Sequence, residues 1–248
     1  MSLDAQELIA PGRRQAPTRR TRYKAEIASV SPESSRSTFE RYDTCFLGVS
    51  LENSNFTTPK LASMVKWISR RFSRCTVLVG DSIHRITLQS TQGMAPGAAR
   101  ERALELGRCF ERGSVEVFAE YRDATEFTLL TCGEVQTWGD YEEFHSKLRA
   151  FFDEDDGFRA SVEAFGRSYH RKRAEGISAA DLGERIRMSS DYFLEEFAVF
   201  ACLQRRGLPV MVYPGSFSTL AEIAKGVHPG APDELRELVV VSLHLKGR

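Results

Sequence analysis

The alternation of short apolar runs with longer amphipathic segments constrains the fold of this chain more than any other feature of its sequence. The apolar runs cover residues 44–50, 75–79, 127–132, 208–213 and 238–243. They have the length and composition of strands that are buried on both faces of a sheet. Segments with helical periodicity lie between them, starting at residue 58, at 97–112, 141–152 and 158–173, near residue 178, and at 218–225. Strands joined by helices predict right-handed crossovers and a parallel sheet that is covered on both faces.

Two helix starts are marked by capping residues. Thr58 is expected to be the N-cap of the helix that Pro59 opens, and Leu61 and Ile68 belong to the buried face of that helix. Ser178, with Asp181 three residues later, has the form of a capping box.

Length and charge together predict one domain with a basic extension. The 248 residues are near the upper size that a single core organises, and we assign residues 41–248 to a Rossmann-like catalytic domain. Residues 1–40 form a basic, partly flexible N-terminal arm. Its cations are Arg13, Arg14, Arg19, Arg20, Arg22 and Lys24. Such an arm is either a solvated tail or a contact for RNA phosphates.

Several classes of protein are excluded. The net charge is zero, no apolar run reaches the roughly 20 residues that span a bilayer, and the first residues lack the apolar core of a signal peptide. We therefore expect a cytoplasmic protein. The five cysteines form no C-x-x-C pair and are expected to be buried, reduced thiols, and no histidine pattern predicts a metal site. Neither G-x-G-x-x-G nor the phosphate-binding loop occurs, so we expect no nucleotide cofactor.

Three residues that can carry chemistry lie at the carboxyl ends of expected strands, where parallel sheets bind ligands: Ser50, Asp81 and Tyr213. Gly48-Val49-Ser50 is similar to the start of the hydrolase elbow G-x-S-x-G. Glu52 occupies the position of the second glycine, and this argues against a lipase-type turn. A serine at this place could also serve only to cap the turn.

Tyr192 and Glu196 lie four residues apart in a segment with helical periodicity, so their side chains share one face. The segment is apolar, and burial is expected to raise the pKa of the Glu196 carboxyl. Glu195 points about 100° away and is expected to face solvent. Alone, Glu196 is better explained as a structural or interface carboxylate than as a catalytic one.

Taken in order, four segments resemble the cyclodipeptide synthases: Gly48-Val-Ser50-Leu-Glu-Asn53-Ser54, Val79-Gly-Asp81, Tyr192-Phe-Leu-Glu-Glu196 and Val212-Tyr213-Pro214. The resemblance covers residues 44–243. It implies a fold similar to the catalytic domains of class I tyrosyl- and tryptophanyl-tRNA synthetases. It also implies an ATP-independent enzyme that takes two aminoacyl-tRNAs and joins their amino acids into a 2,5-diketopiperazine. Tyr213-Pro214 is similar to the Tyr-Pro branch of the family, although Asn53 is more typical of the Tyr-His branch.

The resemblance also implies roles for these residues. Ser50 would accept the first aminoacyl group, Gly48 would allow a close backbone approach, and Asn53 would lie beside the reacting groups. Tyr192 and Glu196 would hold the amino group and assist proton transfer, and Tyr213 would relay a proton during ring closure. Asp81 and Pro214 complete the expected substrate site.

The surface that binds the tRNA body is less clearly marked. Some relatives carry a dense basic helix, whereas the corresponding segment here has Arg100, Arg102, Arg108 and Arg112 among acidic residues. These arginines either bind tRNA or pair with neighbouring acids on a solvated surface. The alternatives for the whole chain are an aminoacyl-tRNA hydrolase, a synthetase-like domain, or a non-catalytic tRNA-binding module. No metal and no membrane partner are expected, and a monomer is the assumed state.

Overall fold

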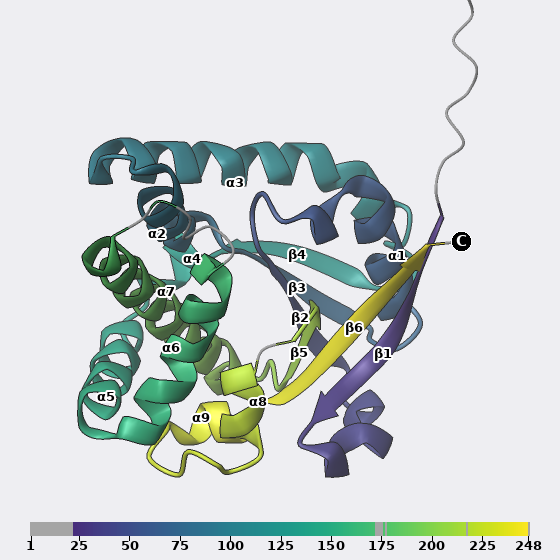
Figure 1. Ribbon diagram of the computed structural model, residues 1–248. Coiled ribbons are helices and arrows are strands. Elements are labelled where there is room, and N and C mark those ends of the chain that lie inside the picture. The colour runs from purple at the N-terminus through teal and green to yellow at the C-terminus, as the bar shows by residue number, and fades with distance from the viewer. Residues whose placement is uncertain (1–21, 172–175, 177, 217, 248) are drawn as a thin grey trace, which may run out of the picture.

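A computed structural model describes residues 22–171, 176, 178–216 and 218–247 of the chain. Six strands form one sheet in the order β1-β6-β5-β2-β3-β4, and all neighbouring pairs are parallel except β1 with β6 (Figure 1). The strands are β1 (Tyr23–Ser31), β2 (Thr44–Val49), β3 (Arg74–Val79), β4 (Glu126–Thr131), β5 (Val210–Pro214) and β6 (Val239–Gly247). The α-helices are α1 (Thr58–Ile68), α2 (Asp81–Gln92), α3 (Pro96–Ala119), α4 (Cys132–Val135), α5 (Tyr141–Glu154), α6 (Asp156–Arg171), α7 (Ala179–Arg205), α8 (Ser218–Ala224) and α9 (Asp233–Arg236). Short 3-10 helices cover Glu33–Ser37, Phe39–Arg41 and Ser54–Phe56.

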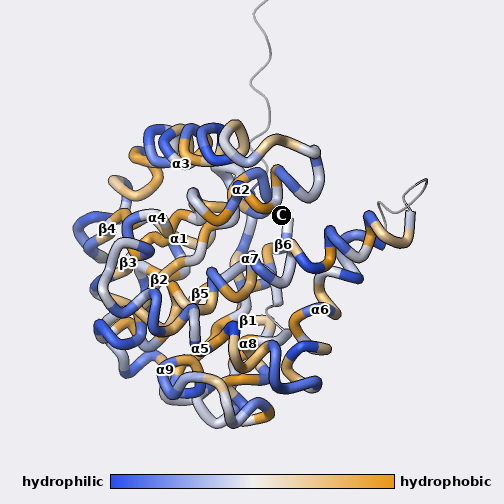
Figure 2. Tube along the Cα trace, turned by 90° about the vertical axis from the view of Figure 1, so that its left-hand side faces the viewer, coloured by the Kyte–Doolittle hydropathy of each residue, from blue (hydrophilic) through white to orange (hydrophobic). Residues whose placement is uncertain are grey.

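Each face of the central strands contributes to its own hydrophobic core, because successive side chains of a strand point to opposite faces. Cys45 and Leu47 of β2 belong to the cluster that includes α1, whereas Phe46 belongs to the cluster that includes α7. Apolar residues accordingly gather along the central strands, whereas hydrophobic and hydrophilic residues alternate along the outer helices (Figure 2). This burial on both faces explains why the central strands read as continuous apolar runs.

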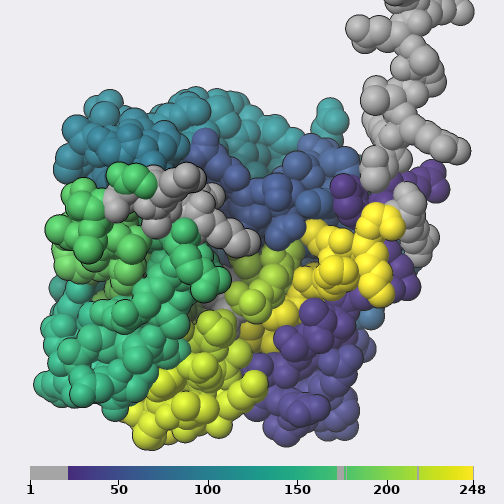
Figure 3. Space-filling model, in the orientation of Figure 1, coloured from purple at the N-terminus to yellow at the C-terminus, as the bar shows by residue number. Residues whose placement is uncertain are grey.

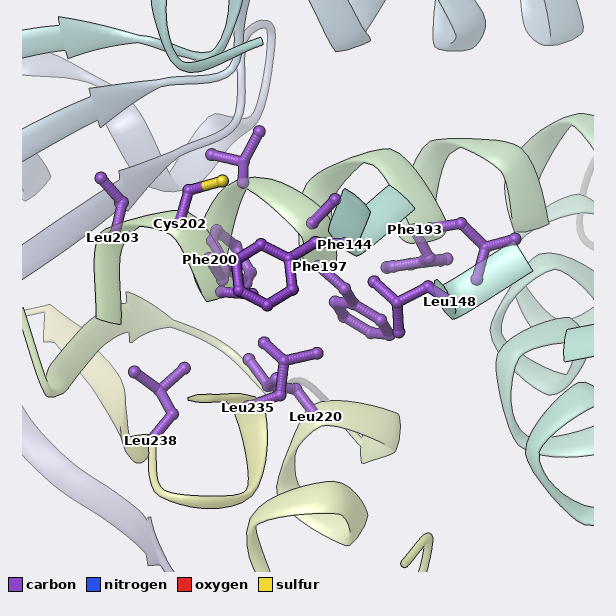
Figure 4. Packing of buried hydrophobic residues seen from close by; sticks show 14 of the residues in the cluster. Phe144, Leu148, Phe193, Phe197, Phe200, Cys202, Leu203, Leu220, Leu235 and Leu238 are labelled. Atoms are coloured by element: carbon purple, nitrogen blue, oxygen red, sulfur yellow. The ribbon is translucent and has the colours of Figure 1, made fainter. Parts of the chain in front are cut away.

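Helix α7 carries much of the second core. Phe197 and Phe200 are buried and lie close to Phe144 of α5 (Figure 4). Leu220 of α8 and Leu235 of α9 lie on another side of these rings (Figure 4). The packing holds α7 firmly, and α7 carries Tyr192 and Glu196.

The five strands expected from the apolar runs are confirmed within one or two residues at most ends, as are the helices between them. Ser178 is confirmed as an N-cap, since its side chain accepts from the Asp181 backbone N–H. The N-cap of α1 is Thr57 rather than Thr58, because Thr58 already has helical geometry ahead of Pro59. Helix α3 continues to Ala119, beyond the expected end near residue 112.

The sequence did not predict β1 and α2, nor the short helices α4 and α9 or the 3-10 helices. Strand β1 lies in the segment assigned to the N-terminal arm and pairs with β6 along one flank of the molecule (Figure 3). The arm's arginines from Arg13 to Arg20 lie outside the described residues. Helix α2 begins directly after β3, so Asp81, which was expected at the end of a strand, is the first residue of a helix.

All five cysteines are free thiols, as expected. Four of them are buried, whereas Cys109 is exposed, so the expected burial is wrong for Cys109. Within the described ranges, no helix is both long enough and apolar enough to cross a membrane.

Candidate active site at the carboxyl ends of β2 and β5

The order of the strands creates a crevice between β2 and β5. After β2 the chain builds β3 and β4 on one side, and then returns to place β5 on the other side of β2. Loops that leave the two strands therefore diverge, which is the usual place for a ligand in such a sheet. A cavity of about 620 Å³ lies here, lined by the loop of residues 50–54 and by parts of α2, α6, α7, β5 and α8.

Ser50 and Tyr213 meet at this cavity. The Ser50 hydroxyl oxygen lies 2.9 Å from the Tyr213 hydroxyl oxygen, and the Asn53 amide donates to the same tyrosine oxygen at 3.3 Å. Burial raises the pKa of Tyr213 to about 12, although its bonds to Ser50 and Asn53 oppose the shift. The tyrosine therefore remains protonated at neutral pH and can act as a proton donor to Ser50.

The loop after Ser50 has an unusual backbone at Glu52, whose φ of 56° is the only positive value at a non-glycine residue in the described part of the chain. This left-handed conformation costs an ordinary residue roughly 1–2 kcal/mol. The Glu52 carboxylate lies 3.1 Å from Nε2 of His84, a buried side chain of α2. Burial lowers the pKa of His84, and Glu52 partly offsets this effect.

Tyr192 and Glu196 line the cavity from α7. The Tyr192 hydroxyl donates to one oxygen of Glu196 at 3.3 Å, while the other oxygen is buried and has no hydrogen-bond partner within the described residues. Burial raises the pKa of Glu196 to about 8, against a smaller opposing effect of the Tyr192 hydrogen bond. The expected shared face and the expected raised pKa are both confirmed.

Gly48 and Pro214 lie beside the cavity and not in its lining. A Cβ atom at Gly48 would come within 3.4 Å of the Met211 side chain and 3.5 Å of the Tyr213 ring. The carbonyl of Pro214 accepts a hydrogen bond from the Asn55 amide at 3.1 Å, which ties the loop to the end of β5.

Asp81 does not meet Ser50 at this cavity. Its carboxylate accepts from the backbone N–H groups of Ser82 at 2.6 Å and Gly133 at 2.9 Å, which joins the starts of α2 and α4. It lines a second cavity of about 740 Å³ together with Arg85 and Glu195. A contact of Asp81 with substrate stays a prediction, and the position favours a structural role.

The expectation that Glu195 faces solvent is wrong. Arg85 of α2 holds both of its oxygens, at 2.5 and 2.9 Å, and the Gln136 amide donates to it at 3.0 Å. Glu195 does point away from Glu196, as the helical geometry requires, but α2 and the segment after α4 cover that side.

The four candidate arginines of α3 have different surroundings. Arg100 lines the second cavity, and Arg102 is exposed. Arg108 and Arg112 both bind the carboxylate of Glu105, at 2.8 and 3.1 Å. The predicted pairing with acids is thus confirmed for two of them, and this pairing reduces the positive charge that they present to a phosphate.

Sequence reasoning missed most of the cavity wall. The overlooked lining residues include His84, Ile86, Thr87, Phe165, Tyr169, Ser189, Phe193 and Thr219. Helix α2 could have been found from its ends, because Asp81 opens it and Gly93, with a φ of 64°, terminates it. The contributions of α6 and α8 depend on tertiary packing, which periodicity does not encode.

Comparison with known proteins adds independent information. A model of the family described as cyclodipeptide synthase matches residues 28–202, a segment that contains Ser50, Tyr192 and Glu196. The cyclo(L-leucyl-L-phenylalanyl) synthase of Streptomyces noursei is 27% identical over 167 residues, covering 65% of this chain and 67% of that protein. A cyclodipeptide synthase structure from Fluoribacter dumoffii is similar in fold, with a TM-score of 0.73, 22% identity and coverage of 90% of this chain and 99% of the other. The synthase of Candidatus Glomeribacter gigasporarum, solved with Phe-tRNAPhe, gives a TM-score of 0.61 at 12% identity, over 83% of this chain and 87% of that one.

Proposed function

The chain belongs to the cyclodipeptide synthase family, and we propose that it joins the amino acids of two aminoacyl-tRNAs into a cyclic dipeptide through an acyl group on Ser50. The observation that carries the proposal is the convergence of Ser50, Tyr213, Tyr192 and Glu196 on one cavity. The structural neighbour solved with an aminoacyl-tRNA supports this choice of substrate. We also propose membership of the Tyr-Pro branch, because Pro214 follows Tyr213 directly.

In the first step the Ser50 oxygen attacks the ester carbonyl of an aminoacyl-tRNA. The new ester forms on Ser50, the ribose–acyl bond breaks, and the hydroxyl proton passes to the departing ribose oxygen. One oxygen ester replaces another, so the step needs no ATP. The covalent intermediate divides a two-substrate condensation into separate steps.

Glu196 and Tyr192 suit the α-amino group of this acyl-enzyme. The free oxygen of Glu196 is a buried acceptor that an amine can satisfy. Its pKa of about 8 is close to that of an α-amine, so a proton can move between them at little cost. Neutral amine then attacks the ester of the second aminoacyl-tRNA, which forms the peptide bond, releases the second tRNA and leaves a dipeptide on Ser50.

Ring closure uses the same serine as a leaving group. The free amine of the dipeptide attacks the Ser50 ester, the carbon–oxygen bond to Ser50 breaks, and the proton of the amine reaches the serine oxygen. Tyr213 can relay this proton, because its protonated hydroxyl lies 2.9 Å from that oxygen. Attack within one molecule benefits from a high effective concentration.

Mass spectrometry of small molecules from cells that express the protein tests the reaction class. A diketopiperazine that is present with the wild type and absent with Glu196→Gln supports the proposal. Free amino acids released from purified aminoacyl-tRNA, without any cyclic product, would instead identify a hydrolase.

A further inference from the structure

The backbone at Glu52 needs an explanation that the proposed chemistry does not supply. A glycine would adopt its left-handed conformation without strain, and an asparagine would adopt it more easily than a glutamate. Glutamate at this position therefore carries a conformational cost within two residues of Ser50. Among the described residues, the hydrogen bond that Glu52 makes comes from its side chain.

The compensating contact is the one with His84. The side chain of His84, which lies on α2, is 6% exposed, whereas the side chain of Glu52 is 44% exposed. Since burial lowers the pKa of His84, a neutral ring donates its Nε2–H to the carboxylate across 3.1 Å. A buried donor thus positions a half-exposed acceptor.

The rest of the loop is tied to the opposite wall of the crevice. Asn53 donates to Tyr213, and Asn55 donates to the carbonyl of Pro214, both at the end of β5. Without the contact to His84, no described hydrogen bond would tie the loop to α2. The bonds that remain run to the end of β5 and, from Lys60 of α1, to the carbonyl of Ser54. Leu51, which is buried between Ser50 and Glu52, adds apolar packing but no directional bond.

We propose that Glu52 and His84 are positioning residues that hold the Ser50 loop between α2 and β5, so that the serine oxygen stays in line for acylation. The inference rests on the proposed acyl transfer through Ser50. Neither residue needs to contact the reacting atoms. The left-handed backbone of Glu52 is then the geometry by which its carboxylate reaches α2.

Two substitutions at Glu52 separate the contact from the strain. Glu52→Gln keeps an acceptor at the same reach and keeps the backbone strain. Glu52→Asn relieves the strain but is too short to reach His84. We expect Asn to lower the single-turnover rate of Ser50 acylation by about 10- to 100-fold, with Gln within about threefold of the wild type. The KM for aminoacyl-tRNA should stay unchanged in both variants. His84→Leu should lower the rate of Ser50 acylation as much as Glu52→Asn does.

Hydrogen exchange of the amides in residues 50–55 measures the loop without any substrate. It should accelerate in Glu52→Asn and His84→Leu and stay near the wild-type rate in Glu52→Gln. Unchanged exchange in the Asn variant, or faster exchange with wild-type acylation, would overturn the proposal. If the wild type itself forms no acyl-Ser50, the proposed function fails, while the exchange data still show whether the contact holds the loop.

Discussion

At the scale of single residues, the most informative group is Glu196. A carboxyl group that is buried in an apolar helix face, with one oxygen that has no partner among the described residues, is destabilising unless it stays protonated or meets a ligand. The raised pKa of about 8 means that it is mainly protonated at neutral pH. A neutral amine that binds here could take up this proton and form an ion pair with the carboxylate, so one proton would be shared between enzyme and substrate.

The raised pKa of Glu196 predicts how stability depends on pH. The folded state keeps a proton that the unfolded state loses above about pH 4.5, so unfolding becomes easier as pH rises from there to about 8. The contribution of this group to the free energy of unfolding is complete below the lower value and lost above the upper one. The free energy of unfolding of the wild type should therefore fall by a few kcal/mol over this pH range, since each pKa unit corresponds to about 1.4 kcal/mol. We expect Glu196→Gln to abolish this fall.

Denaturant titrations of the wild type and Glu196→Gln at about pH 5 and about pH 9 measure this difference. Parallel pH profiles for the two proteins would contradict the buried, protonated state.

Glu195 and Glu196 should respond differently to the same substitution. Glu196→Gln removes the group that exchanges a proton with the amine, and we expect cyclic product to fall by about 100-fold or more, as for a lost general base. Glu195→Gln weakens the ion pair with Arg85, which is largely buried, and should cost about 1–2 kcal/mol of stability with a smaller effect on turnover. Product formation and thermal unfolding of the two variants test the assignment, and a larger loss of turnover at Glu195 would reverse it.

At the scale of elements, α2 separates the two cavities. Consecutive residues of this helix point to different partners, His84 to the Ser50 loop and Arg85 to Glu195 beside Glu196. The helix thus sets the distance between the nucleophile loop and α7. The hydrogen bond to the Ser50 loop on one side of α2 and the ion pair with Glu195 on the other are therefore carried by one helix.

Helix α3 carries the arginines whose binding of tRNA can be tested. We propose that Arg108 and Arg112 contact tRNA phosphates and that Glu105 competes with those phosphates for them. Arg108→Glu should raise the KM for aminoacyl-tRNA and reduce the salt dependence, whereas Glu105→Gln should lower KM, because phosphate contacts release counterions. Ring closure involves no tRNA body and should not change.

Kinetics over a salt series decide this point, with Arg122→Glu as the control, an exposed arginine just beyond the end of α3. Equal effects of Arg108→Glu and Arg122→Glu on KM would place the tRNA on another surface.

The sequence predicted the elements whose pattern is local and missed those that depend on context. Strands β2, β3 and β5 are buried on both faces, so their apolar runs identify them directly. Strand β1 is an edge strand of mixed exposure, with a register shift between Ile27 and Ser29 and no regular alternation, and it pairs with the last described strand, β6. The i, i+4 spacing placed Tyr192 and Glu196 together, whereas the contact of Glu52 with His84 spans 32 residues and has no local signature.

At the scale of the whole molecule, the strand order brings the site together. Ser50 and Tyr213 are 163 residues apart in the chain. They meet because β5 pairs with β2 on the side opposite to β3 and β4. The apolar runs predicted the strands but not their order. The resemblance to a known family supplied what the pattern alone could not, namely that these ends converge.

The covalent step on Ser50 is the central claim, and the intact mass of the protein tests it most directly. Purified protein mixed with one aminoacyl-tRNA and rapidly quenched should gain the mass of a single aminoacyl group, located on the peptide that contains Ser50. Ser50→Ala should gain no mass and form no cyclic product, while its unfolding midpoint stays close to that of the wild type. Cyclic product from Ser50→Ala at more than a few per cent of the wild-type rate, or an adduct on another residue, would contradict the account.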